Sequence, residues 1–156
     1  MTLTEAWIGQ QMSGPPSEPY GVGRRALVAE DDDEMRALLA ATLRHDGFEV
    51  VVARNGLELV NLLVPWLAGR ETSEPIDVIV SDVQMPSFTG MQVLAGLSEA
   101  HRAPPMVLIT AFGDPATHDL ARDLGAVAVL DKPFDLDDLR GVLSQVIAEL
   151  QPPLAG

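Results

Sequence analysis

The sequence has no cysteine and only one lysine among its 156 residues. The lack of cysteine excludes a disulfide framework and thiolate metal sites, which leaves oxygen ligands for any metal ion. No apolar stretch reaches the roughly 18 residues that span a bilayer. No basic residue precedes Arg24, so the start lacks the charged region of a signal peptide. We therefore expect a cytoplasmic protein that does not bind membranes.

Positive charge is scarce as well. Lysine and arginine together number 10 against 23 aspartates and glutamates, which gives a formal net charge of −13. Such a charge disfavours nucleic-acid backbones and anionic membranes as direct partners. Apolar residues, by contrast, make up 47% of the chain and predict a globular body rather than a disordered one.

The length predicts one domain, since roughly 100–200 residues per domain is usual. We place this domain at residues 24–150. Residues 1–23 are predicted to be a flexible tail, because the stretch 13–23 is rich in proline and glycine and cannot continue a helix. A docking segment that uses Trp7 and Ile8 is the alternative. Residues 151–156 are predicted to be a C-terminal tail.

Five short apolar runs alternate with segments of helical spacing. Most of the runs are continuously apolar, which is typical of parallel strands covered on both faces; they are 26–29, 48–53, 76–80, 106–109 and 126–130. The helical spacing is clearest at 35–43 and 136–150. The pattern predicts an α/β fold, a doubly wound five-stranded parallel sheet with five helices on its two faces. Pro65 and Gly69 are expected to end the second helix.

Polar groups stand where four of the five apolar runs end: Glu30-Asp31, Ser81-Asp82, Thr110 and Asp131-Lys132. In a doubly wound sheet, ligands bind at the edge formed by the carboxyl ends of the strands. We therefore expect these groups to lie close together. The second run ends without comparable groups, which suits a strand at the edge of the sheet.

Three carboxylates at one edge repel one another unless a cation neutralises them. The predicted cation is Mg²⁺, which takes few protein carboxylates and keeps room for phosphate oxygens. Asp82 can then act as a nucleophile that forms an aspartyl phosphate. Lys132 is a compact positive charge suited to the phosphoryl oxygens, and Thr110 offers a hydroxyl donor beside them.

Each of these side chains also has a simpler interpretation. The acidic run 31–33 can cap the first helix. Asp82 can be an ordinary loop carboxylate, and Thr110 a hydroxyl residue that ends a strand. Lys132 can be a solvated surface lysine. Three histidines have no metal-ligand spacing and are interpreted as solvated surface residues: His45, His101 and His118.

Four linked motifs, taken in order, resemble the response-regulator receiver domain of two-component signalling. They are Glu30-Asp31, Asp82-x-x-Met85-Pro86 with Gly90, Thr110-Ala111, and Lys132-Pro133-Phe134. The resemblance covers residues 24–150. It implies a flavodoxin-like strand order of 2-1-3-4-5.

The resemblance implies a role for each matching residue. Asp82 matches the phosphoacceptor, and Thr110 and Lys132 match the residues that bind the phosphoryl group and couple it to a switch. A cis Lys132-Pro133 peptide bond is implied as well. The implied donor is a phosphohistidine in a histidine kinase or a histidine phosphotransfer protein, and the implied receiver of the signal is a downstream protein target or the next member of a phosphorelay.

The same resemblance implies how Mg²⁺ is held. Asp31 matches a direct ligand, Asp82 is itself a ligand, and Glu30 matches the acidic neighbour that holds the ion through water. Gln84 matches the position whose backbone carbonyl completes the metal shell.

The resemblance thus predicts a phosphorylated receiver that stands alone. It would have no enzymatic turnover except slow loss of its own phosphoryl group. Two alternatives to this prediction stay open. One is an interaction module that keeps the fold but is not phosphorylated. The other is an aspartate-nucleophile phosphatase, which is disfavoured because such enzymes usually carry a second aspartate where this chain has Gln84. The chain also departs from many receivers in two places. One is Val129, where an aromatic residue is usual. The other is the extra length around Trp66, which we interpret as a surface insertion or as a partner-specific patch.

Overall fold

The computed structural model describes residues 15–100, 102–111 and 114–150. Five strands form one parallel sheet in the order β2-β1-β3-β4-β5. The strands are β1 Arg25–Ala29, β2 Glu49–Ala53, β3 Val78–Asp82, β4 Met106–Thr110 and β5 Ala128–Asp131. The predicted sheet and its strand order are therefore confirmed, and the second run does form an edge strand.

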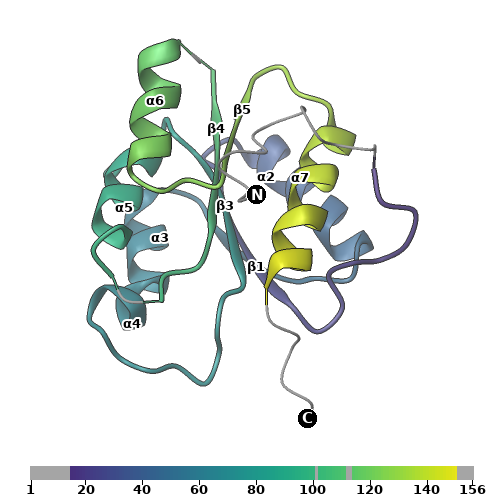
Figure 1. Cartoon of the computed structure of the whole chain (residues 1–156), viewed down its shortest axis with the longest axis horizontal. Coiled ribbons are helices and arrows are strands. Elements are labelled where there is room, and N and C mark those ends of the chain that lie inside the picture. Colours follow the sequence, from purple (N-terminus) through teal and green to yellow (C-terminus); the bar gives the residue numbers. More distant parts are fainter. Residues whose placement is uncertain (1–14, 101, 112–113, 151–156) are drawn as a thin grey trace.

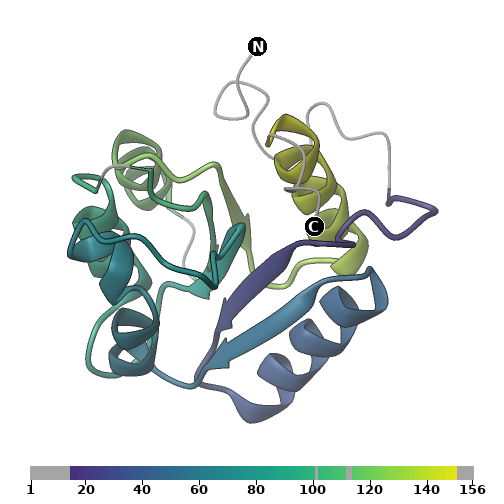
Figure 2. The same cartoon turned by 90° about the horizontal axis from the view of Figure 1, so that it is seen from below.

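Six helices in the described residues cover the two faces of the sheet (Figures 1 and 2). They are α2 Asp33–His45, α3 Gly56–Leu62, α4 Val64–Leu67, α5 Gly90–Leu97, α6 Pro115–Asp123 and α7 Leu136–Glu149. Helices α2 and α7 lie on one face, and the others lie on the opposite face. In this part of the chain no helix is both long enough and apolar enough to cross a membrane.

Each face of the sheet carries its own apolar core. Leu27 belongs to the core under α3, α5 and α6, whereas its neighbour Val28 belongs to the core under α2 and α7. Successive side chains of a strand point to opposite faces, so a strand buried on both faces must be apolar at every position. This is why the runs in the sequence are continuous rather than alternating.

The prediction of a single second helix ended by Pro65 is wrong. Helix α3 ends at Leu62, and Pro65 lies in the first turn of a separate short helix, α4. Proline lacks the N–H that a helix interior needs, but the first turn leaves that N–H unbonded in any case. Gly69 follows α4 with a φ of +66°, as expected for a residue after a helix end. Trp66 of α4 packs half-buried against the core.

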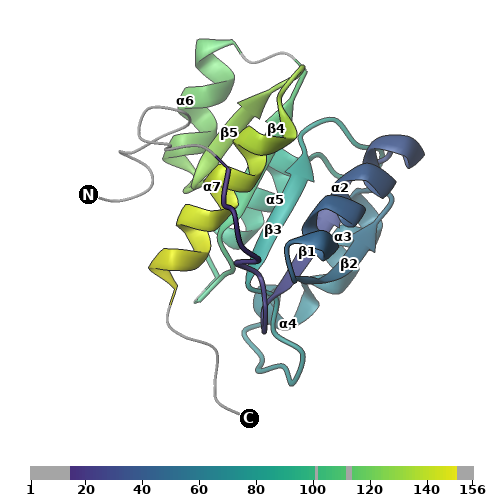
Figure 3. The same ribbon diagram turned by 90° about the vertical axis from the view of Figure 1, so that its right-hand side faces the viewer.

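Residues 15–23, which were predicted to belong to a flexible tail, make specific contacts with the domain. The ring of Tyr20 packs edge-on against Phe48 with centroids 5.3 Å apart. The Gly21 N–H donates to the Asp46 carbonyl at 2.8 Å, and Arg140 donates to the Pro16 carbonyl at 3.2 Å. Figure 3 shows this segment crossing the face that carries α2 and α7. The remaining tail predictions, with Trp7 and Ile8, fall outside the described residues.

Candidate functional site

The polar groups that follow the strands meet at one edge of the sheet, as predicted. Lys132 Nζ lies 2.9 Å from Asp82 Oδ2 and 3.4 Å from Glu30 Oε1. Glu30, Asp31 and Asp82 each offer a carboxylate oxygen within 4.8 Å of the other two. Glu30 and Asp82 are buried, with 1% and 4% of their surface exposed, while Asp31 is exposed. Residues from three separate strand ends thus form one cluster, hereafter the acidic site.

Backbone groups complete the acidic site. The Gln84 N–H donates to Asp82 Oδ1 at 3.0 Å, which leaves Oδ2 to face Lys132. Thr110 is buried at the end of β4, and its carbonyl accepts the Lys132 N–H at 2.8 Å. The Lys132-Pro133 peptide bond is cis, which confirms that prediction. The neighbouring strand end therefore fixes the backbone from which the lysine reaches Asp82.

The residues of the acidic site fit a hard divalent cation. Three carboxylates and one ammonium leave a net charge of −2 (3 − 1 = 2) at a largely buried place. Oxygen is the donor atom that Mg²⁺ prefers. The ligands that the resemblance implies, namely Asp31, Asp82, the Gln84 carbonyl and Glu30 through water, come from the ends of β1 and β3, which are neighbours in the sheet.

Burial and the charges of the acidic site together shift two pKa values. Burial raises the pKa of Glu30 to about 7, and the neighbouring carboxylates of Asp82 and Asp31 act in the same direction, against the lowering effect of Lys132. Burial alone would lower the pKa of Lys132, but Asp82 and Glu30 hold it above its usual value. Lys132 is therefore charged at neutral pH, whereas Glu30 holds a proton more readily than an ordinary glutamate does.

We expect the metal-free domain to lose stability as pH rises from about 4.5 to about 7. Glu30 has its pKa raised from 4.5 to about 7 by folding, so the folded state binds more protons than the unfolded state in this range. The free energy of unfolding then falls with pH, by about 3 kcal/mol over the whole range. The contribution of Glu30 is measured as the difference in the free energy of unfolding between wild type and Glu30→Gln, from urea unfolding in the presence of a chelator. If this difference does not vary between pH 5 and 7, the raised pKa of Glu30 is contradicted. Mg²⁺ should reduce the pH dependence of the difference, because its binding releases the proton from Glu30.

The start of α5 is packed directly against the end of strand β3. A Cβ atom on Gly90 would lie 2.5 Å from the Asp82 carbonyl oxygen, which is closer than real Cβ contacts come. The Gly90 N–H donates to the Val83 carbonyl at 3.0 Å, and Ser81 Oγ donates to the Asp82 carbonyl at 2.9 Å. The glycine of the Asp82 motif is thus required by this close approach of two backbones.

We expect Gly90→Ala to destabilise the domain by about 1–3 kcal/mol, because backbone atoms must move to admit the methyl group. Gly96→Ala in the same helix is the matched control. Its Cβ would meet only Leu67 Cδ2 at 3.5 Å, an ordinary contact, and alanine favours helix by roughly 0.5–1 kcal/mol. Thermal or urea unfolding of both variants gives the comparison, and equal effects would rule out the packing argument.

Two contacts near the acidic site were not predicted. Arg36 of α2 donates to the Glu30 carbonyl at 3.0 Å and pairs with Asp33. The i, i+3 spacing of Asp33 and Arg36 was a usable signal for the ion pair. His118, interpreted as a solvated surface residue, has only 19% of its side chain exposed and lies 2.9 Å from Asp131, so that interpretation is wrong. His45 is exposed as expected, and His101 lies outside the described residues.

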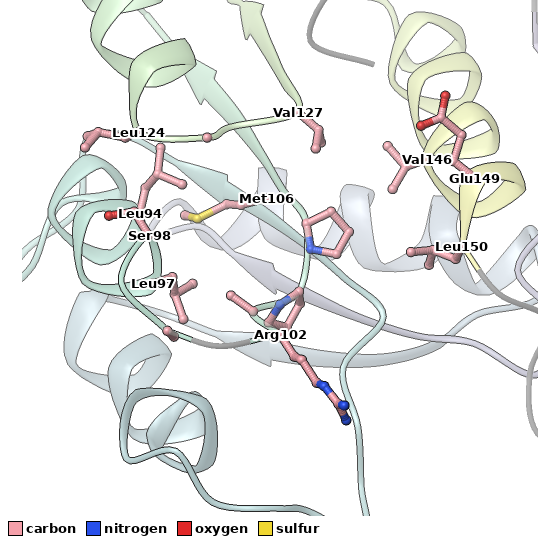
Figure 4. Close-up of a pocket in the computed structure, with 15 residues that line it drawn as sticks. Leu94, Leu97, Ser98, Arg102, Met106, Leu124, Val127, Val146, Glu149 and Leu150 are labelled. Atoms are coloured by element: carbon pink, nitrogen blue, oxygen red, sulfur yellow. The ribbon is translucent and has the colours of Figure 1, made fainter. Parts of the chain in front are cut away.

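A cavity of about 550 Å³ lies at the opposite edge of the sheet, away from the acidic site (Figure 4). It is bordered by the start of β4 at Met106, by the last residue of α5, Leu97, and by the last residue of α7, Glu149. The acidic site itself is a polar cluster at the carboxyl edge. This cavity and the acidic site therefore lie at opposite ends of the strands.

The fold and the acidic site define a class, doubly wound domains with an acidic cluster and a lysine at the carboxyl edge of the sheet. Residues 26–144 match the family model described as the response regulator receiver domain. The chain belongs to this family.

Two curated relatives are transcriptional regulators. The chain is 38% identical over 130 residues to the transcriptional regulatory protein PdtaR of Mycobacterium tuberculosis (strain ATCC 25618 / H37Rv), covering 82% of this chain and 59% of the relative. It is 33% identical over 111 residues to the transcriptional regulatory protein CpxR of Escherichia coli (strain K12), covering 71% of this chain and 44% of the relative. The chain thus spans about half the length of these two proteins.

Solved structures agree with the family. A response regulator receiver domain protein from Clostridium thermocellum matches with a TM-score of 0.70 and 26% identity, covering 80% of this chain and 94% of that one. The non-phosphorylated HemR receiver domain from Leptospira biflexa matches with a TM-score of 0.71 and 25% identity, covering 83% and 98%.

Proposed function

We propose that this receiver domain accepts a phosphoryl group on Asp82 from a phosphohistidine of a histidine kinase or histidine phosphotransfer protein. The observation that carries the proposal is the buried Asp82 carboxylate with Lys132 Nζ at 2.9 Å and two further carboxylates beside it. A carboxylate is a competent nucleophile toward phosphorus when the negative charges around it are neutralised. Membership of the receiver family supports a phosphohistidine as the donor class.

In the transfer, an Asp82 oxygen forms a new bond to phosphorus while the bond from phosphorus to the donor's imidazole nitrogen breaks. The imidazole leaves with the electron pair of that bond. Lys132, which bonds Asp82 Oδ2, then neutralises charge on the phosphoryl oxygens, and the Thr110 hydroxyl donates to the same group. The Gln84 N–H holds the carboxylate in a fixed orientation through Oδ1.

The same residues support a bound Mg²⁺, with Asp31 and Asp82 as direct ligands, the Gln84 carbonyl as a third, and Glu30 through water. When bound, the ion neutralises the carboxylates and the incoming phosphoryl oxygens. In the metal-free site, protonation of Glu30 lowers the negative charge of the cluster, since its pKa is raised to about 7.

The output we propose is a changed contact with a downstream protein, or transfer of the phosphoryl group along a phosphorelay. Apart from its own phosphorylation and slow dephosphorylation, the domain has no turnover in this proposal. The net charge of −13 supports protein partners rather than nucleic acid. The cytoplasmic location and the stand-alone action expected from the sequence stay predictions.

The test is intact-mass analysis after incubation with a small phosphodonor, with Mg²⁺ or with a chelator. We expect one added phosphoryl group per chain with Mg²⁺ and almost none with the chelator. A chain that gains no mass with Mg²⁺, although circular dichroism shows it folded, would favour the alternative of a module that is not phosphorylated.

A further inference from the structure

A side-chain hydrogen bond joins helix α6 to the end of strand β5. His118 Nε2 of α6 lies 2.9 Å from Oδ1 of Asp131, the last residue of β5. An ionised carboxylate only accepts hydrogen bonds, so Nε2 carries the proton and donates. The His118 side chain is largely buried while Asp131 is half-exposed, with 19% and 53% of their side chains exposed. We refer to this pair as the His118–Asp131 clasp.

The clasp is attached to the strand end that carries the reacting groups. Asp131 directly precedes Lys132 and lies in register with Thr110 of the neighbouring strand. The Lys132 N–H also donates to the Thr110 carbonyl, so these three residues share one stretch of paired backbone. A displacement of this stretch of backbone therefore also moves the carboxylate that His118 holds. Figure 1 shows α6 beside β4 and β5.

Lys132 has different partners before and after phosphoryl transfer. In this structure its ammonium bonds Asp82 Oδ2 and Glu30 Oε1 directly. A phosphoryl group on Asp82 places new oxygens between the carboxylate and the ammonium, and the lysine must bind those oxygens instead. The ammonium has to draw back from the carboxylate to make room for them. In this structure the His118–Asp131 clasp and the direct Lys132–Asp82 contact occur together.

Val129 of β5 is completely buried and has no ring with which to link the strand to α6. It lies in the same apolar core as Ala121 of α6. The clasp adds a polar contact between the strand and the helix, two residues further along the same strand.

We propose that the His118–Asp131 clasp couples the acidic site to α6 and holds the domain in its unphosphorylated arrangement. This inference rests on the proposed function, because it concerns the effect of phosphorylation at Asp82. The clasp acts as a brake: it stabilises the arrangement in which Lys132 contacts Asp82, and it is strained or broken when a phosphoryl group is bound. His118 and Asp131 are positioning residues and do not touch the reacting atoms.

Linkage fixes the direction of the expected effect. If phosphorylation weakens the clasp, removal of the clasp must favour binding of a phosphoryl group by the same factor. A pair of this exposure is worth a few tenths to about 1 kcal/mol, which corresponds to an affinity change of about two- to fivefold. Such a change lies within what a titration resolves.

The experiment is titration of the domain with beryllofluoride, a phosphoryl mimic, in Mg²⁺, followed by amide signals of the residues around Asp82. We expect His118→Ala and Asp131→Ala each to bind beryllofluoride about two- to fivefold more tightly than wild type. The double variant should match the single ones, because one contact can be lost only once. In wild type, the mimic should also increase hydrogen exchange in α6, and this increase should vanish in His118→Ala.

Asp119→Asn is the matched control. It removes a carboxylate from α6, but the partner of this carboxylate, Arg122, lies in the same helix, so no contact between α6 and β5 is lost. Its affinity for beryllofluoride should equal that of wild type. Unchanged or weaker binding by both clasp variants would overturn the brake, and so would a tighter binding shared by Asp119→Asn. If wild type fails to bind beryllofluoride at all, the proposed function itself is overturned and the brake with it, which separates the two failures.

Discussion

Replacement of Asp82 by asparagine will reduce phosphoryl incorporation from a small phosphodonor by at least about a thousandfold, the scale on which loss of a nucleophile acts. Asparagine keeps the shape of the side chain and can still accept the hydrogen bond from the Gln84 N–H. It lacks the negatively charged oxygen that attacks phosphorus. Intact-mass analysis of both proteins under the same conditions measures the difference. Equal incorporation in the variant would place the acceptor elsewhere.

The same variant should be more stable than wild type in the absence of metal, by about 0.5–2 kcal/mol, because one of three crowded carboxylates loses its charge. Asp46→Asn is an informative control. Asp46 is also buried, but it receives two hydrogen bonds from Arg140, at 2.8 and 2.9 Å, and its loss should cost about 1–3 kcal/mol. Opposite signs for these two buried aspartates, read from urea unfolding in a chelator, would identify Asp82 as functional rather than structural.

Lys132→Ala will lower the rate of phosphorylation by about 100- to 1000-fold, the usual cost of removing a donor aimed at the charge that develops in a transition state. Lys132 is the only lysine of the chain, and its Nζ bonds both Asp82 and Glu30. Binding of Mg²⁺ should persist in the variant, because the carboxylates that hold it remain. The rate is measured by intact mass over time, and Mg²⁺ affinity by titration of Trp or amide signals.

Lys132→Arg should recover only part of that rate, since a planar guanidinium presents its donors in a different geometry from an ammonium. A full recovery would mean that positive charge alone matters at this position. A wild-type rate in Lys132→Ala would show that the lysine plays no part in the transfer.

The fold was predictable to the extent that local pattern determines it. Continuous apolar runs predicted strands buried on both faces, and the strand ends predicted which residues would meet. The break between α3 and α4 was missed because Pro65 was assumed to end a helix, although proline is equally suited to begin one. The contacts of Tyr20 and Gly21 with the domain were missed because a Pro- and Gly-rich segment has no periodicity of its own.

The sequence by itself determined the members of the acidic site, since a carboxylate or ammonium at the end of a buried strand can be found from the order of residues alone. Three features depended on the tertiary structure alone. They are the choice of the Asp82 oxygen that faces Lys132, the raised pKa of the buried Glu30, and the contact between His118 and Asp131. The physical reason is that distance and burial depend on residues far apart in the chain: Lys132 and Glu30 are 102 positions apart, and no local pattern records their separation in space.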